Sequence, residues 1–157
     1  MTVLLVRHAR AGRRESWQGD DRLRPLTVRG RAQAIALAEV IRPWVSADTE
    51  LVSSPWLRCI QTLEALPSTG APVGAIRIDE VLGEGMGSKA AAEVLGSWVG
   101  VGTAVLCTHG DVIDEVLSRL SDAGIDLGRR PTAPKGSVWV LEGSSEVRSA
   151  RYLPPPG

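Results

Sequence analysis

The chain has 157 residues, 43% of them apolar and 23% charged, which fits one soluble domain and excludes a wholly disordered or fibrous chain. Its 18 basic residues balance 18 acidic ones, which argues against a nucleic-acid partner. No apolar run approaches the roughly 18 residues of a membrane helix, so we expect no membrane partner and a cytoplasmic location. We expect a single domain over residues 1–153 and a frayed, proline-rich tail over residues 154–157.

Basic charge is concentrated near the N-terminal end of the chain. Residues 1–31 hold eight arginines against three acidic residues, a local excess of five positive charges. Sixteen of the 18 basic residues in the whole chain are arginines, whose planar guanidinium suits phosphate or carboxylate. An ordinary solvated surface would have the same composition. The positions of the arginines relative to the predicted elements must therefore distinguish an anion-binding site from such a surface.

The sequence contains two cysteines, Cys59 and Cys107, both within apolar patterns. Two cysteines do not make a disulfide framework, and neither belongs to a Cys-x-x-Cys or Cys/His cluster. We therefore expect buried, reduced thiols and no structural zinc. We also expect no metal and no other cofactor.

Short apolar runs alternate with helical patterns along the chain. Strands are expected over residues 2–6, 50–53, 75–78 and 103–108, with a hairpin over residues 137–151. Helices are expected after Thr27, after Ser54, from Ser88 to Val99 and after Gly110, and the longest loop covers residues 9–26. Ser54 is followed by Pro55 and is predicted to cap its helix. This alternation predicts an α/β fold, a three-layer sandwich whose largely parallel sheet carries helices on both faces.

Both histidines of the chain directly follow predicted strands. Arg7 and His8 come after the first strand, and His109 comes after the strand of residues 103–108. Arg58 lies one turn into the second helix. Because ligands of such sheets bind beyond the carboxyl ends of the strands, we expect these four side chains to converge at one edge. A single histidine of this kind is ordinarily a hydrogen-bonded residue filling a strand end, but two with attached arginines favour a functional site.

This set of side chains suits a phosphoryl group. Two guanidiniums can bind a tetrahedral anion, and the helix N termini after Ser54 and Gly110 add N–H donors. Nearby cations lower the pKa of a histidine, so a neutral imidazole can attack phosphorus and carry the phosphoryl group. The leaving group then needs a proton, for which Asp79, Glu80 and Glu84 are the candidates between the third strand and the next helix. Each of the three carboxylates is equally well explained as a solvated loop residue.

These motifs resemble those of the histidine phosphatase superfamily, in its phosphoglycerate mutase-like branch. Residues 5–9 (LVRHA) resemble the RHG/RHA signature, residues 53–62 (SSPWLRCIQT) the SSP-x-x-R-x-x-Q-T block, and residues 108–110 (THG) the second His-Gly motif. Residues 24–27 (RPLT), with Gly30 and Gln33, resemble the family's entry from loop to helix. The blocks occur in order from about residue 3 to residue 116.

The resemblance implies a phosphoglycerate mutase-like fold and a role for each matching residue. It implies that His8 is the phosphorylated nucleophile and that Arg7, Arg58 and His109 bind the phosphoryl group. Glu84 occupies the proton donor's place in an L-x-E pattern. The sequence departs there from the longer family pattern, which usually continues into Gly-Trp-Gly, so the two other carboxylates stay open as donors.

Ala9 stands where glycine is commoner in the family, as in the SixA-type protein-histidine phosphatases, and the short chain resembles those compact members. Residues 7–12, 17–26 and 107–112 resemble the phosphatase half of actinobacterial Nudix–histidine-phosphatase fusions, which act on nucleotide diphosphates. No Nudix half is expected here, because the first strand starts at once.

On this narrower likeness, the loop of residues 10–24 is expected to bind substrate. Its arginines Arg10 and Arg24 are candidates for a second phosphate, and Trp17 is a candidate for stacking on a base. A hydrophobic plug over the loop is the competing interpretation of Trp17.

We therefore expect a metal-independent phosphatase that hydrolyses a phosphate ester or a nucleotide diphosphate through phosphohistidine at His8. One alternative is the same chemistry on a phosphohistidine protein, and another is a non-catalytic phosphate-binding regulatory module. A metal hydrolase using His8, His109 and Asp111 is disfavoured, because Arg7 and Arg58 would repel the cation. The sequence leaves the oligomeric state open.

Overall fold

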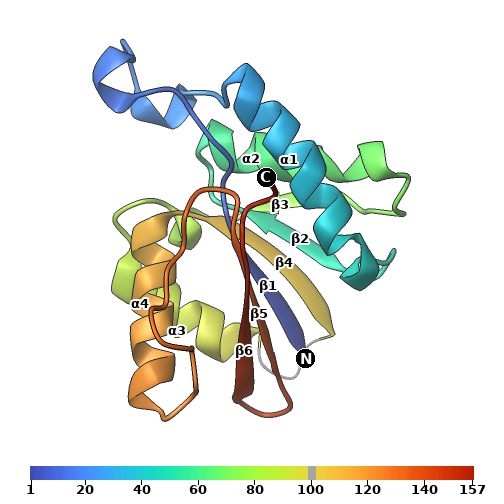
Figure 1. Ribbon diagram of the computed structural model, residues 1–157, viewed down its shortest axis with the longest axis vertical. Coiled ribbons are helices and arrows are strands. Elements are labelled where there is room, and N and C mark those ends of the chain that lie inside the picture. Colours follow the sequence, from blue (N-terminus) through green and yellow to red (C-terminus); the bar gives the residue numbers. More distant parts are fainter. Residues whose placement is uncertain (99–101) are drawn as a thin grey trace.

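The computed structural model describes residues 1–98 and 102–157. Within these residues, six strands form one sheet in the order β3-β2-β4-β1-β5-β6 (Figure 1). The strands are β1 (Thr2–Arg7), β2 (Glu50–Ser53), β3 (Ile76–Ile78), β4 (Thr103–Thr108), β5 (Val138–Gly143) and β6 (Val147–Leu153). Strands β3, β2, β4 and β1 are parallel, whereas β5 and β6 run antiparallel to their neighbours. The largely parallel sheet and the C-terminal hairpin are therefore confirmed.

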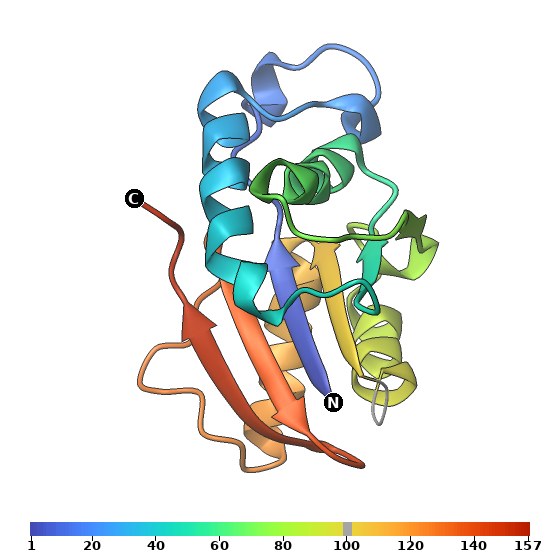
Figure 2. The same ribbon diagram turned by 90° about the vertical axis from the view of Figure 1, so that its right-hand side faces the viewer.

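Helices cover both faces of this sheet, which confirms the three-layer sandwich (Figure 1, Figure 2). Helices α1 (Val28–Ile41) and α2 (Leu57–Glu64) lie on one face, and α3 (Gly87–Ser97) and α4 (Gly110–Asp122) on the other. Successive side chains of a strand point to opposite faces. In β1, Leu4 and Val6 therefore pack under α1 and α2, while Val3 and Leu5 pack under α3 and α4.

The predicted N-terminal cap of α1 is confirmed, but the predicted cap of α2 is wrong. Thr27 caps α1, and its hydroxyl accepts a hydrogen bond from the Gly30 N–H at 2.9 Å. Ser54 does not cap α2, which begins at Leu57. Its hydroxyl accepts from the Trp56 N–H at 3.2 Å, just before the helix, and lies 2.8 Å from Nε2 of His109.

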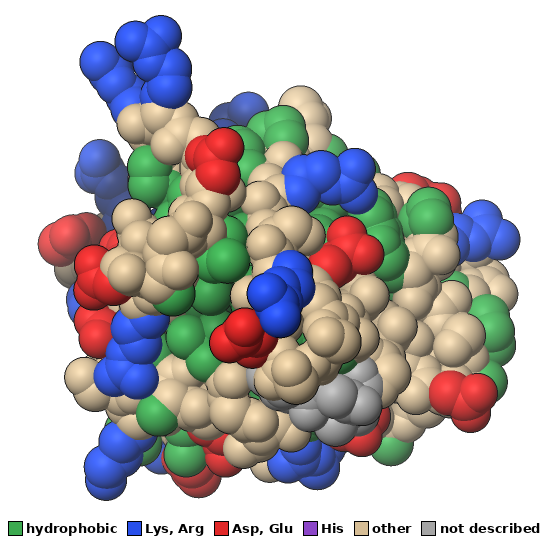
Figure 3. All heavy atoms as spheres, turned by 90° about the horizontal axis from the view of Figure 1, so that it is seen from below, with side chains coloured by type: hydrophobic (Ala, Val, Ile, Leu, Met, Phe, Trp, Pro, Cys, Tyr) green, Lys and Arg blue, Asp and Glu red, His purple; other side chains and the backbone are tan. Residues whose placement is uncertain are grey.

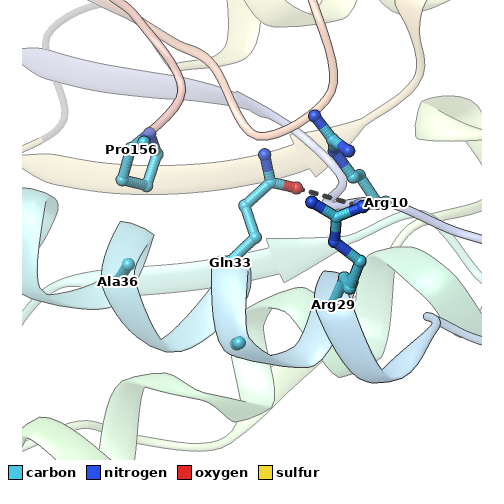
Figure 4. Close-up of a pocket in the computed structure, with 7 residues that line it drawn as sticks. Arg10, Arg29, Gln33, Ala36 and Pro156 are labelled. Carbon is cyan, nitrogen blue, oxygen red and sulfur yellow. Dashed lines mark hydrogen bonds between the residues drawn. The ribbon is translucent and has the colours of Figure 1, made fainter.

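The remaining segments depart from the expected pattern in two places. The loop of residues 9–26 contains two short 3₁₀ turns, Arg14–Ser16 and Asp21–Leu23. The tail is not frayed, because β6 delivers it to α1, where the half-buried Pro156 lines a cavity beside Gln33 (Figure 4). The predicted end of the third helix, Val99, lies outside the described residues.

The parallel strands β1, β2 and β4 all end at the edge of the sheet beneath the loop of residues 9–26 (Figure 2). At the opposite edge, basic and acidic side chains lie scattered among one another and no histidine is seen (Figure 3). Among the described residues, no helix combines the length and the apolar character needed to cross a bilayer.

Candidate active site

His8 follows β1 directly and is buried, with 4% of its surface exposed. Its backbone is fixed on two sides, because its N–H donates to the Thr108 carbonyl and its carbonyl accepts from the Gly136 N–H. Its ring Nδ1 lies 2.8 Å from the carbonyl oxygen of Ala9. A carbonyl can only accept, so Nδ1 carries the proton and Nε2 keeps a lone pair. Arg58 Nε donates to that Nε2 at 3.3 Å, which agrees with this tautomer.

The pKa of His8 lies well below its ordinary value of 6.5. Burial is the main cause, since it penalises the charged ring. The hydrogen bond to Ala9 opposes this effect, and the charges of His109, Arg58 and Arg7 reinforce it. The imidazole is therefore neutral at physiological pH, as a nitrogen nucleophile must be.

His109 lies opposite His8, with the two ring centroids 5.5 Å apart. The edge of the Trp56 ring packs against His109 at a centroid distance of 5.2 Å. Nδ1 of His109 and Nε of Arg7 are buried and have no hydrogen-bond partner within the described parts of the chain. Buried polar atoms of this kind are stabilised when a ligand or water meets them.

Arg7 is placed by the start of α4. Its Nη1 donates to the Ala133 carbonyl at 2.7 Å, and its guanidinium lies against Gly110. A Cβ at position 110 would lie 2.9 Å from Arg7 Cζ, so this glycine is what allows the guanidinium to approach the N terminus of α4. The N–H groups of that terminus point toward the same region, where an anion is favoured.

Arg58 is almost wholly buried, with 1% exposed, and joins three segments. Besides His8, it contacts Asp21 twice: Nη1 donates to the Asp21 carbonyl at 3.0 Å, and Nη2 donates to its carboxylate at 3.1 Å. Arg58 Nη2 also lies 3.6 Å from the carboxylate of Glu84.

Asp21 was given no role from the sequence, where it was one of three acids among eight arginines and part of the segment 17–26 that resembles the Nudix fusions. Its carboxylate accepts from Arg24 Nε at 2.8 Å as well as from Arg58. Partial burial acts to raise the pKa of Asp21, but the hydrogen bond from Arg24 and the charge and hydrogen bond of Arg58 bring it down to about 2. Arg24 also donates to the Gly12 carbonyl. Because Arg58 belongs to α2, its bond to the Asp21 carboxylate ties the loop to that helix.

Lys135 is the second residue of the site that was not predicted from the sequence. It lies in residues 123–136, for which the sequence predicts no regular structure. Backbone contacts hold it at the site: its carbonyl accepts from Gln33 Nε2 at 3.2 Å, and the next N–H donates to the carbonyls of Arg7 and His8. Burial lowers the pKa of Lys135, and the positive charges of Arg7, Arg24 and other arginines lower it further.

These side chains surround one cavity of about 290 Å³. Its lining includes both histidines, Gly110 and two carboxylates, Glu15 and Glu84. Six cationic side chains complete it: Arg7, Arg13, Arg14, Arg24, Arg58 and Lys135. So strong an excess of cations around a neutral imidazole favours a polyanionic ligand.

Of the three candidate acids, Glu84 alone lines this cavity. It accepts from Arg14 at 2.6 Å, and the Gly85 N–H after it donates to Asp111 at 2.8 Å, which fastens the turn to α4. Asp79 instead accepts from the Val81 N–H, and Glu80 is an exposed partner of Arg22.

Two residues that the sequence suggested for substrate binding line other cavities. Arg10 faces a separate cavity of about 270 Å³ beside α1, where its N–H donates to Gln33 (Figure 4). Trp17 lies in a third hollow, and its indole N–H donates to the Asp20 carbonyl at 2.9 Å. Ser54 reaches the site indirectly, through its contact with His109.

A parallel sheet edge with a neutral histidine ringed by guanidiniums defines an α/β protein of the phosphoryl-transfer class. Comparison with known families is more specific, since residues 3–90 match the histidine phosphatase superfamily (branch 1). The chain belongs to this superfamily.

One curated relative is the 8-oxo-(d)GTP phosphatase of Mycolicibacterium smegmatis, which is 38% identical over 160 residues. The match includes 99% of this chain but 48% of the relative, so the chain spans about half the length of that protein.

Two solved structures have the same fold. The protein histidine phosphatase SixA in complex with tungstate superposes with a TM-score of 0.77 at 19% identity, covering 99% of this chain and 97% of that one. A mycobacterial glucosyl-3-phosphoglycerate phosphatase superposes with a TM-score of 0.69 at 17% identity, covering 97% and 96%. At such low identities, these likenesses establish the fold alone.

We predict that Asp21→Asn lowers the free energy of unfolding by about 1–2 kcal/mol at pH 7, because it removes the charge that holds Arg58 and Arg24. The folded pKa of Asp21 is about 2 against an ordinary 3.8, so this stabilisation is present above about pH 4 and is lost as the pH falls through 2. Urea denaturation between pH 2 and pH 7 measures the difference. Asp20→Asn is the matched control, since asparagine also caps the turn that Asp20 caps. An equal effect of both substitutions would contradict the prediction.

We also predict that the ring resonances of His8 show no inflection near pH 6.5 in the folded protein. Since the folded pKa is depressed, the unfolded chain takes up the proton first, and stability falls as the pH drops below about 6.5. Proton NMR measures the titration, and a His109→Gln variant assigns the two ring signals. His8→Gln should lack this part of the acid destabilisation. An inflection near pH 6.5 in the folded protein would show that the pKa of His8 is not lowered by burial, which would contradict the prediction.

Proposed function

We propose that the protein is a metal-independent phosphatase that works through a phosphohistidine at His8. The observation that carries this proposal is the tautomer of His8: Nδ1–H is held by the Ala9 carbonyl, so Nε2 carries the lone pair, which accepts from Arg58 Nε, and the ring lines the cationic cavity. A binding module needs the cations alone, whereas an oriented, neutral imidazole serves nucleophilic attack.

The reaction has two steps in which bonds and protons balance. Nε2 of His8 attacks phosphorus, the P–N bond forms, and the bond from phosphorus to the leaving oxygen breaks. Glu84, when protonated, gives its proton to that oxygen. Water then attacks the phosphohistidine while the Glu84 carboxylate takes its proton, the P–N bond breaks, and inorganic phosphate is released.

The cations act on the charge of the transferring group. Arg7, Arg58 and His109, with the N–H groups of α4, are the donors for its equatorial oxygens, where charge is spread in the transition state. Arg58 contacts His8 itself, so the nucleophile and one oxygen donor are positioned together. Ser54 positions His109.

We propose a small phosphorylated molecule as the substrate, with nucleoside diphosphates as the favoured class. A single phosphoryl group occupies the donors nearest His8, which leaves Arg13, Arg14 and Lys135 of the same cavity for a second phosphate. The relatedness to an 8-oxo-(d)GTP phosphatase supports a nucleotide as substrate. The fold shared with SixA makes a phosphohistidine protein the second candidate.

We predict that His8→Ala lowers phosphatase turnover about 10³-fold or more, because the nucleophile is lost. Release of phosphate from GDP and from p-nitrophenyl phosphate measures this, in the presence and absence of EDTA, which should have no effect. The wild type mixed with β-³²P-labelled GDP should form an acid-labile protein label that His8→Ala lacks. His8→Asn, which is closer in size, guards against a folding defect. Turnover that survives both substitutions, or inhibition by EDTA that zinc reverses, would remove the proposal.

Glu84→Gln should slow hydrolysis of alkyl phosphates about 100-fold, because an alkoxide leaves poorly without a proton. The same substitution should slow p-nitrophenyl phosphate much less, since nitrophenolate leaves without help. Steady-state kinetics on both esters gives the ratio, and Glu80→Gln, an exposed carboxylate on the same segment, is the matched control. Equal losses on both esters would assign Glu84 a positioning role through Arg14 and Arg58.

A further inference from the structure

Trp56 directly precedes α2, and its ring contacts three separate segments around the candidate active site. The ring meets His109 at 5.2 Å between centroids, with the two planes 74° apart. The guanidinium of Arg22 lies over the Trp56 ring, 4.8 Å from its centroid, as in a cation–π contact. On a third side lies Gly83, where a Cβ would be 2.5 Å from Cζ3 of the indole. Trp56 stands at an unspecified position of the SSP-x-x-R-x-x-Q-T block, so that motif gives it no role.

The backbone of Trp56 acts on His109 through Ser54. The Trp56 N–H donates to Ser54 Oγ at 3.2 Å, and the same oxygen lies 2.8 Å from Nε2 of His109. Ser54 is fully buried, and in the described parts of the chain Nε2 is the one acceptor within reach of its hydroxyl proton. Because a buried hydroxyl donates where an acceptor is available, Ser54 donates to Nε2. The ring proton of His109 is therefore on Nδ1.

The buried thiol of Cys59 agrees with this tautomer. Its Sγ lies 3.6 Å from Nε2 of His109 and 3.7 Å from the Thr108 carbonyl, to which the thiol donates. A thiolate beside a doubly protonated ring would instead place a buried anion against that carbonyl oxygen. With Nε2 as an acceptor, the N–H at Nδ1 is the buried group that lacks a partner within the described residues. Since His109 lines the catalytic cavity, this N–H is the donor that it offers to a phosphoryl oxygen.

The 3₁₀ turn Asp21–Leu23 reaches both sides of the catalytic cavity. Its first residue accepts from Arg58, which donates to Nε2 of His8. Its second residue lies over the Trp56 ring, which packs against His109. One turn of the loop therefore holds the nucleophile through Arg58 and the opposite histidine through Trp56.

From these contacts we infer that Trp56 is a positioning residue for His109. Its ring fixes the plane of the imidazole, and its N–H on Ser54 leaves the ring proton on Nδ1, as a donor to the transferring phosphoryl group. The inference rests on the proposed function, in which His109 binds that group, and it adds how the donor is held. Because Arg22 and Gly83 meet at the same indole, a displacement of either segment is transmitted to His109.

Kinetics on p-nitrophenyl phosphate tests the role of the ring. Trp56→Leu should lower kcat about tenfold with a smaller change in KM, because the donor acts on charge that develops in the transition state. Trp56→Phe should recover most of the rate, since a phenyl ring still packs against the imidazole. Leu120→Ala removes a buried side chain at the end of α4 opposite Gly110, so it controls for lost stability and should keep the wild-type kcat. A kcat that Trp56→Leu leaves unchanged would overturn the inference.

Nitrogen-15 NMR of the imidazoles adds a measurement that needs no turnover, because protonated and bare ring nitrogens resonate far apart. At neutral pH we expect His109 to carry its proton on Nδ1 alone, and Ser54→Ala to give a mixture of tautomers. Orthovanadate, which takes up the five-coordinate geometry of a transferring phosphoryl group, should shift the Nδ1 signal of the wild type. In Trp56→Leu, about tenfold more vanadate should be needed for the same shift.

A proton on Nε2 of His109 in the wild type, either alone or together with one on Nδ1, would contradict the inference. An Nδ1 signal that vanadate leaves in place would also contradict it. Failure of the proposed function has a different signature, namely phosphatase turnover that persists in His8→Ala.

Discussion

The rest of the site depends on the hydrogen bonds that the Arg58 guanidinium makes. It donates to Nε2 of His8 at 3.3 Å, to the Asp21 backbone at 3.0 Å and to the Asp21 carboxylate at 3.1 Å. A buried cation without partners is strongly unfavourable, so a chain that places Arg58 under the loop must also supply an anion there. Asp21 supplies it, and in doing so the carboxylate folds the arginine-rich loop down over the end of β1.

The same constraint governs the charge of the whole cavity. Six cationic side chains line it, and burial first and the repulsion of neighbouring arginines second lower the pKa of Lys135. Glu84 and Asp21 offset part of this charge by pairing with Arg14 and Arg58. In the proposed function a phosphoryl dianion completes the balance, and it does so most strongly when its charge is spread over oxygens that meet several donors at once. The cavity is thus built for an anion that carries more charge than two carboxylates provide.

The sequence predicted the parts of the site that follow from regular structure. Because parallel strands end at one edge, the positions of His8 and His109 along the chain were enough to bring the two rings together, and the structure confirms this at 5.5 Å between centroids. The family motifs lie on the same strand ends. Local rules located the start of α2 less well: the Ser54 hydroxyl accepts from the Trp56 N–H and contacts His109, and the helix begins only at Leu57.

The residues that arrive through loops could not be predicted, because their paths depend on contacts between distant segments. The Gly136 N–H donates to the carbonyls of Arg7 and His8, and this bond places the neighbouring Lys135 at the site. No sequence pattern in residues 123–136 predicts that bond. For Arg10 the prediction was wrong in the opposite sense: a residue expected at the site lies outside it. It is two residues from His8, yet the chain turns after β1, and Arg10 faces the cavity beside α1 (Figure 4).

This division between strands and loops also explains how one fold can serve different leaving groups. SixA and the mycobacterial glucosyl-3-phosphoglycerate phosphatase share the architecture of this chain, with TM-scores of 0.77 and 0.69, although their names give them different substrates. The phosphate end of the cavity is built from strand and helix ends, which the fold fixes. In the proposed function the leaving-group end is built from the loop of residues 9–26, which Asp21 fastens by pairing with Arg24 and Arg58. On the same proposal, a loop fastened in this way needs little ordering when the substrate binds, so its side chains discriminate among leaving groups at a small entropic cost.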